Sequence, residues 1–144
     1  MLGTLLDEGV SLIQPALWQN HIELEQVRNP IDRQEVEVDP DQIKQVILNI
    51  LLNAIDAQGE GGVIYLEGVQ QDGFVGFAVS DEGPGISPDD LPYIYDLFFT
   101  MKEKGTGLGL SVVHRILDQH GRRISTANRS DRGIRVEILL PYMA

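Results

Sequence analysis

The sequence predicts a two-layer α/β sandwich in which one β-sheet is covered on a single face by helices. Three observations lead to this prediction. The chain has 144 residues, of which 42% are hydrophobic, and this suits one compact domain with a real core. Segments with helical spacing of apolar residues alternate with pairs of short segments in which polar and apolar residues alternate. Their order is helix, two strands, helix, two strands, loop, helix and two strands, with no internal repeat.

Two helices are predicted in the first part of the chain. The first covers about 4–18, and its core-facing residues recur at helical spacing as Leu6, Val10, Ile13 and Leu17. The second is a long helix over about 40–57. Asp39 and Pro40 supply its N-cap and first-turn proline, and Gly59 marks its end.

The remaining elements are strands, one long connection and a third helix. The predicted strands cover about 22–27, 34–38, 62–69, 73–80, 123–128 and 134–140. From 81 to 107 the chain is rich in Gly, Pro and charge, with a short helical piece around 92–97. A connection of this length in a small domain is usually functional or mobile. The third helix is expected over 108–120, where Gly121 ends it.

Composition excludes several classes of function. The 11 Lys and Arg stand against 22 Asp and Glu, a formal net charge of −11, so a nucleic-acid partner is not expected. The chain has no cysteine, which excludes disulfides and thiolate metal sites. No apolar run approaches the length of a membrane span, and the start lacks the pattern of an export signal. We therefore expect a cytoplasmic domain without membrane contact, monomeric in isolation.

The long helix contains two asparagines within its most apolar stretch. Asn49 and Asn53 lie four residues apart and so share one face, on which Gln45 and Asp56 also lie. A buried amide without a partner costs about 1–3 kcal/mol, so these side chains need something to bind. They could cap strands or hold ordered water in the core. Alternatively, their oxygens could serve a hydrated magnesium ion and phosphates.

A second candidate motif, Asp81-Glu-Gly-Pro-Gly-Ile86, follows directly on a predicted strand. A carboxylate held at a strand end can accept a hydrogen bond from an exocyclic amine, and Gly83 and Gly85 would let backbone approach a flat ring. A plain tight turn would use the same residue types.

A third motif, Gly105-Thr-Gly-Leu-Gly-Leu110, opens the last predicted helix. Amides at a helix N-terminus, with glycines removing side-chain obstruction, can bind an anion, although a flexible hinge would also be glycine-rich. Its spacing is neither that of a Walker P-loop nor that of a dinucleotide fingerprint. The preceding Leu97-Phe-Phe-Thr-Met-Lys-Glu-Lys104 suits a lid over phosphates or an ordinary hydrophobic anchor.

In their order and spacing these motifs resemble the N, G1, F and G2 boxes of the catalytic and ATP-binding domain of sensor histidine kinases. The matching patterns are Asn-x-x-x-Asn-Ala-x-x-Ala at 49–57, Asp-x-Gly-x-Gly at 81–85, Phe-Phe-Thr-x-Lys at 98–102 and Gly-x-Gly-x-Gly at 105–109. The wider GHKL superfamily also holds the DNA gyrase, heat-shock chaperone and mismatch-repair ATPases.

The resemblance implies a Bergerat-type fold, with a mixed sheet covered by about three helices, that binds ATP and Mg²⁺ between the long helix and the lid. By matching position Asn53 would ligate Mg²⁺, Asn49 would support it or a phosphate, and Lys102 would meet the phosphates. Asp81 would hold the adenine amine. The other residues expected to contact the nucleotide are Asp56, Gly83, Gly85, Ile86, Phe99, Thr100, Gly105, Thr106, Gly107, Leu108, Gly109 and Leu110.

The chain lacks the histidine context that accepts phosphate in these kinases. None of His21, His114 and His120 lies in a His-Glu-x-x-Asn/Arg-Pro pattern, and His120-Gly121-Arg122 departs from the family's His-Gly-Gly. We therefore expect 1–144 to be one catalytic domain without its dimerisation and phosphoacceptor hairpin. That hairpin and, indirectly, a response regulator would be its partners, besides ATP and ADP.

Two other functions stay open at this point. Hydrolysing members of the superfamily place a Glu general base where this chain has Asn49, so transfer to an external nucleophile is favoured. A stand-alone anti-sigma-factor serine kinase suits the chain length but typically has Glu at that position too. A binding module that closes on nucleotide without turnover is the other alternative.

Overall fold

A computed structural model describes residues 2–28, 36, 39–71, 73–83, 123–128 and 133–141 of the chain. Along the sequence the elements are α1 (Leu2–Gln19), β1 (Glu23–Val27), α2 (Pro40–Gln58), β2 (Val63–Gln71), β3 (Phe74–Ser80), β4 (Arg123–Asn128) and β5 (Ile134–Pro141). Each of them corresponds to a predicted element with similar bounds. The predicted helix over 108–120 and the helical piece around 92–97 lie outside the described residues, as does the strand over 34–38 apart from Val36.

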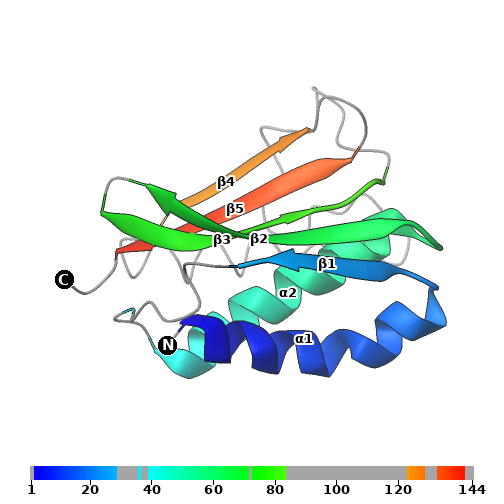
Figure 1. Cartoon of the computed structure of the whole chain (residues 1–144), viewed down its shortest axis with the longest axis horizontal. Coiled ribbons are helices and arrows are strands. Elements are labelled where there is room, and N and C mark those ends of the chain that lie inside the picture. Colours follow the sequence, from blue (N-terminus) through cyan, green and yellow to red (C-terminus); the bar gives the residue numbers. More distant parts are fainter. Residues whose placement is uncertain are drawn as a thin grey trace, which may run out of the picture.

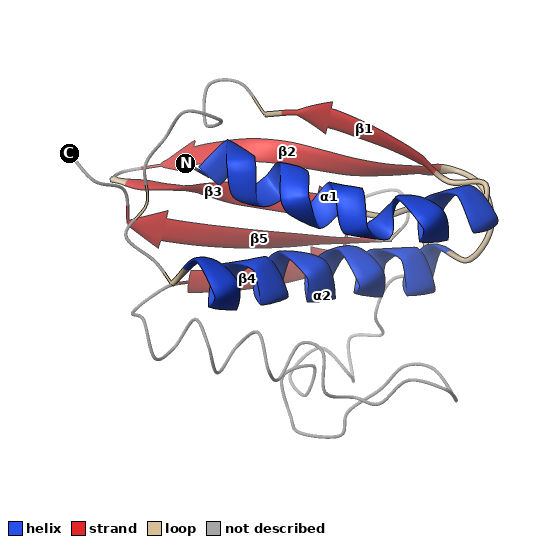
Figure 2. Cartoon of the chain, turned by 90° about the horizontal axis from the view of Figure 1, so that it is seen from below, coloured by secondary structure: helices blue, strands red, loops and turns tan. Residues whose placement is uncertain are grey.

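The strands form one sheet in the order β1-β2-β3-β5-β4. β1 and β2 are parallel, with α2 lying between them in the sequence, whereas the other neighbours pair antiparallel, so the sheet is mixed. Figures 1 and 2 show α1 and α2 side by side on the same face of this sheet. The predicted fold class, a two-layer α/β sandwich with helices on one face, is confirmed.

The ends of α2 are set by the residues that the sequence indicates. Asp39 has extended backbone (φ −73°, ψ 115°), and its side chain accepts hydrogen bonds from the amides of Asp41 at 3.0 Å and Gln42 at 3.4 Å. Pro40 begins the helix, where its missing N–H removes no hydrogen bond. At the other end Gly59 has φ +79°, a conformation that glycine adopts without strain. The helix therefore starts and stops for local chemical reasons.

The core lies between the two helices and the inner face of the sheet. All four core-facing residues predicted for α1 are buried, and Phe77 at the middle of β3 is fully buried. α1 and α2 pack closely at Gly9, where an added Cβ would lie 2.5 Å from Ile47 Cγ2. At the surface beside this contact Glu8 lies 3.2 Å from Lys44 Nζ, and this hydrogen bond raises the pKa of Lys44. The two helices thus form one layer.

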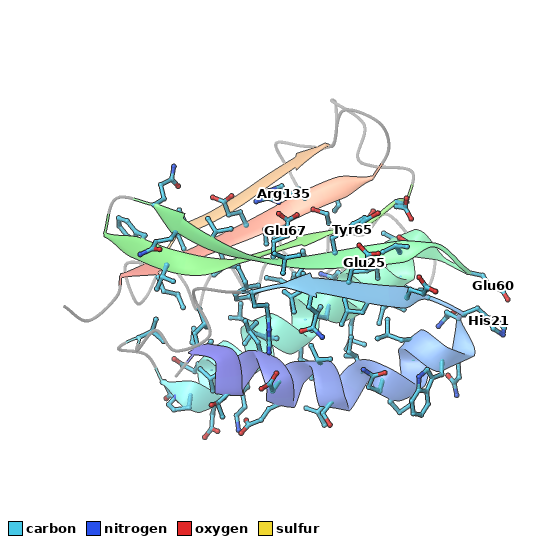
Figure 3. All side chains as sticks on the ribbon, viewed as in Figure 1. His21, Glu25, Glu60, Tyr65, Glu67 and Arg135 are labelled. Atoms are coloured by element: carbon cyan, nitrogen blue, oxygen red, sulfur yellow. The ribbon has the colours of Figure 1, made fainter. Side chains whose placement is uncertain are left out.

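The opposite face of the sheet is polar. Arg135 on β5 reaches across β3 to Glu67 on β2, with Nη1 and Oε1 3.2 Å apart, and Figure 3 shows both side chains on the face away from the helices. Ala78 lies between these two strands in the register and is fully buried. None of the described helices is long and apolar enough to cross a membrane.

Candidate functional site

The two asparagines of α2 lie at the edge of its buried face. Asn49 and Asn53 are half-buried, and Asp56 is exposed. Leu52, which lies between the two asparagines in the sequence, is 39% exposed. Within the described parts of the chain neither amide side chain has a hydrogen-bond partner. These amides therefore border the core without being enclosed in it, and their oxygens remain candidates for ligand contact.

Asp81 is the buried acid at the end of β3. Its side chain and backbone are 1% exposed, and Oδ1 accepts hydrogen bonds from the amides of Gly83 at 2.9 Å and Ile134 at 3.3 Å. Its own amide donates to the carbonyl of Ile134 at 3.0 Å. Hydrogen bonds to an ionised carboxylate are stronger than neutral ones, so these contacts offset part of the penalty for burying it. The start of β5 thus fixes the carboxylate in place.

Two glycines make the close contacts around Asp81 possible. Gly133 has φ +89°, and an added Cβ there would lie 2.0 Å from the carbonyl oxygen of Asp81 and 2.8 Å from its Oδ1. A Cβ on Gly83 would lie 2.4 Å from the carbonyl oxygen of Ala57 in α2. We predicted that Gly83 admits close backbone approach to a ring. In the described structure the group that it admits is the last turn of α2.

Side chains that the sequence analysis did not select tie this loop to α2. The amide of Gln58 accepts a hydrogen bond from the backbone N–H of Glu82 at 2.7 Å, and the Glu82 carboxylate accepts one from the N–H of Val63 at 2.8 Å. Gln58 belongs to none of the motifs, and Glu82 fills a variable position of Asp-x-Gly-x-Gly. Their contact joins positions 24 apart in the sequence. The residue that follows Asp81, the acid predicted to bind adenine, is therefore hydrogen-bonded to α2, the helix that carries the amides predicted to bind metal.

The other predicted site residues lie outside the described part of the chain and stay predictions. They are Gly85, Ile86, Phe99, Thr100, Lys102, Gly105, Thr106, Gly107, Leu108, Gly109 and Leu110. His114 and His120, which are not predicted site residues, also lie outside the described part of the chain. His21 is described: its Nδ1 lies 2.9 Å from Glu60 Oε1, and both side chains are 75% exposed at the end of the sheet in Figure 3. This surface contact gives His21 no part in the candidate site.

Solved structures define the class of protein to which this architecture belongs. The catalytic domain of histidine kinase ThkA is 35% identical with a TM-score of 0.88, covering 97% of this chain and 91% of that one. Full-length ShkA in complex with AMPPNP is 26% identical with a TM-score of 0.85, covering all of this chain and 30% of ShkA. The fold is that of a histidine kinase catalytic domain.

Sequence comparison gives the family. Residues 38–144 match the family described as histidine kinase-, DNA gyrase B- and HSP90-like ATPases, and the chain belongs to this family. Sensor histidine kinase ZraS of Escherichia coli K12 is 39% identical over 140 residues, covering 97% of this chain and 30% of ZraS. Sporulation kinase C of Bacillus subtilis is 31% identical over 140 residues, covering 97% of this chain and 33% of that kinase. The chain thus spans about a third of the length of these relatives.

Proposed function

We propose that the chain binds Mg-ATP and, within a longer sensor kinase, transfers the γ-phosphate to a histidine on a separate helical domain. The observation that carries the proposal is the buried carboxylate of Asp81. It is held at the end of β3 beside the last turn of α2, the helix whose polar edge bears Asn49 and Asn53. The family match and the similarity to histidine kinase domains support this assignment.

Asp81 would bind the base. A buried carboxylate accepts hydrogen bonds only, so it selects a ring that presents an N–H donor, as the exocyclic amine of adenine does. Because backbone amides already orient this carboxylate, it needs little reorganisation when the base arrives. Guanine has a carbonyl oxygen at the equivalent position, and this oxygen would be repelled by the carboxylate oxygens of Asp81.

Asn53 and Asn49 would serve the phosphate end. Among the described residues no group of three or more His, Cys, Asp or Glu side chains could hold a metal ion. Mg²⁺ keeps several waters and binds through one or two protein oxygens and substrate phosphates, so such a site needs few protein ligands. The amide oxygens fit this donor set, with Asn53 as the ligand and Asn49 in support. Bound there, the ion would neutralise charge on the phosphates.

Lys102, Thr100 and the glycine-rich segment from Gly105 to Leu110 complete the proposed phosphate site on the strength of their motifs. An amide at position 49 cannot take a proton from water, so the site favours transfer to an external nucleophile over hydrolysis. In that transfer the bond from the γ-phosphorus to the β-γ bridging oxygen breaks, a nitrogen–phosphorus bond forms on the histidine, and ADP leaves. We place this reaction in the cytoplasm, as for the kinases that the motifs resemble.

The phosphate would pass onward to a response regulator. The similar ThkA kinase has been solved in complex with its response regulator TrrA, at 31% identity and a TM-score of 0.85. For the present chain both the histidine-bearing hairpin and the regulator are proposed partners.

Incubation with γ-labelled ATP tests the proposal, with a separately produced phosphoacceptor hairpin in one reaction and an anti-sigma antagonist in a parallel one. Label on the hairpin's histidine supports the kinase. Label on the serine of the anti-sigma antagonist instead supports the serine kinase, and binding without transfer to either protein leaves the nucleotide-responsive binding module. If calorimetry shows no ATP binding in the presence of Mg²⁺, all three are excluded.

A variant pair tests the role of Asp81. Asp81→Asn keeps an oxygen for the backbone amides but replaces one acceptor by a donor, so ATP affinity should fall about tenfold or more. Asp41→Asn makes the same change at an exposed carboxylate in the first turn of α2 and should leave affinity unchanged. Equal ATP affinity in both variants would remove Asp81 from the base site.

A further inference from the structure

Gln58, the last residue of α2, joins three segments through a single side-chain amide. Nε2 donates to the carbonyls of Gly61 at 2.9 Å and Val63 at 3.3 Å, and Oε1 accepts from the N–H of Glu82 at 2.7 Å. Because it both donates and accepts, the amide has one satisfactory orientation, and a carboxylate could not replace it. Gln58 thus does more than end the helix.

Glu82 closes the arrangement into a ring. Its Oε1 accepts from the N–H of Val63 at 2.8 Å, so the end of α2, the start of β2 and the segment after β3 are each bonded to the other two. Gly62 leaves room for the pair, since an added Cβ would lie 2.4 Å from Gln58 Nε2 and 3.0 Å from Glu82 Oε1. We call Gln58 and Glu82 the α2–β3 clamp.

We propose that the α2–β3 clamp positions the Asp81 carboxylate relative to α2, and so fixes the separation between base recognition and the phosphate-side amides. The inference rests on the proposed function. Glu82 directly follows Asp81, so the hydrogen bond from its backbone N–H to Gln58 ties α2 to the residue next to the acid. Gln58 lies five residues beyond Asn53 on the same rigid helix, about 7.5 Å along its axis. Both ends of the nucleotide would then bind to one preorganised body.

The alternative is that the clamp only stabilises the fold, and the two cases make different predictions about ligand choice. If the clamp positions Asp81, the affinity that ATP gains from its 6-amine should fall when the clamp is removed. If the clamp only stabilises the fold, removing it should lower the melting temperature but leave unchanged the relative affinities for nucleotides that differ only in the 6-amine. The informative quantity is therefore the ratio of the affinities for ATP and for purine riboside triphosphate, which lacks the 6-amine.

Gln58→Met is the test variant, because methionine has similar length and no strong hydrogen-bonding group. By calorimetry with Mg²⁺, the parent should bind ATP about tenfold or more tightly than purine riboside triphosphate. In Gln58→Met this preference should shrink to about twofold, through a loss of ATP affinity with little change for the analogue. Gln70→Met makes the same substitution at an exposed position at the other end of β2 and should keep the full preference.

Glu82→Ala provides a second, independent variant in case Gln58→Met does not fold. It should also reduce the preference, and the double variant should lose no more than the worse single one, because both act through one network. A preference that stays tenfold in a folded Gln58→Met or Glu82→Ala protein would overturn the positioning role even if the melting temperature falls. If the parent binds neither nucleotide, the proposed function itself fails, a result that is distinct from equal preference in parent and variant.

Discussion

Gly133→Ala is the substitution whose effect can be worked out most fully from the structure. Gly133 has φ +89°, where a residue with a Cβ is strained by about 1–3 kcal/mol. Its added Cβ would also lie 2.0 Å from the carbonyl oxygen of Asp81 and 2.8 Å from its Oδ1. Both atoms belong to a buried residue held by backbone hydrogen bonds, so relieving the overlap should cost a further 1–3 kcal/mol or so, as overpacking usually does.

The total of about 2–6 kcal/mol corresponds to a fall in melting temperature of roughly 6–18 °C for a domain of this size. Relieving the overlap must move Asp81, so we also expect ATP affinity to fall at least about tenfold, which is 1.4 kcal/mol. Gly73→Ala is a matched control. Gly73 has nearly the same φ, +83°, at the hairpin between β2 and β3, but an added Cβ there meets nothing within 4 Å.

The control therefore carries the backbone strain without the collision. Thermal unfolding and calorimetry on both variants separate the two terms: Gly73→Ala should lose only the strain term in stability and should bind ATP like the parent. Equal losses of stability in the two variants, with ATP affinity unchanged in both, would show that Gly133 does not constrain Asp81.

Two further predictions concern α2 as a structural element. Gly9→Ala should lower the free energy of unfolding by about 1–3 kcal/mol, because its Cβ would lie 2.5 Å from Ile47 Cγ2. Ile47→Ala removes that atom but leaves a cavity in the core, so the double variant should lose less stability than the sum of the two single changes. A double variant less stable than the sum of both single changes would contradict this close packing. Asp39→Ala removes the oxygen that accepts hydrogen bonds from the first-turn amides, so it should lower the free energy of unfolding by about 1 kcal/mol in chemical denaturation. Asp39→Ser should recover most of this loss. Equal stability of the parent and both variants would argue against the cap.

The elements of the fold were predictable because their causes are local. The N-cap at Asp39, the proline after it and the positive φ of Gly59 all act within one turn of the residues that they terminate. Similarly, the apolar spacing in α1 reports directly on which side is buried. The mixed sheet was expected only from the resemblance, because no local pattern in β1 says that its partner β2 lies beyond a whole helix.

The candidate site was predictable only in part, for the same reason. Asp81 and Asn53 stand out because polar groups beside apolar runs need partners. The residues that surround Asp81 do not stand out. Gly133 reads as one more turn residue, and its neighbour Ile134 reaches Asp81 across 53 positions through the pairing of β3 with β5. Gln58 reads as an ordinary helix-ending amide. Their functions follow from tertiary contacts that sequence spacing does not encode.

Asn53→Leu separates a binding role of the amide from a structural one. Asn53 is half-buried and has no hydrogen-bond partner in the described parts of the chain, so leucine removes no such contact there and raises helix propensity by up to about 0.5 kcal/mol. Without ligand the variant should melt at the same temperature as the parent or slightly higher.

With Mg-ATP at about 100 times its dissociation constant, the parent should gain about 2.7 kcal/mol by linkage. The Asn53→Leu variant should gain almost nothing. Gln14→Leu, an equal change at a half-buried amide on α1, should keep the full gain. If instead Asn53→Leu loses about 1–3 kcal/mol without ligand, the amide has a buried partner and serves the core, because that is the penalty for breaking such a bond. A stable protein that no longer responds to Mg-ATP would show that the polar edge of α2 is kept for the ligand at the expense of stability.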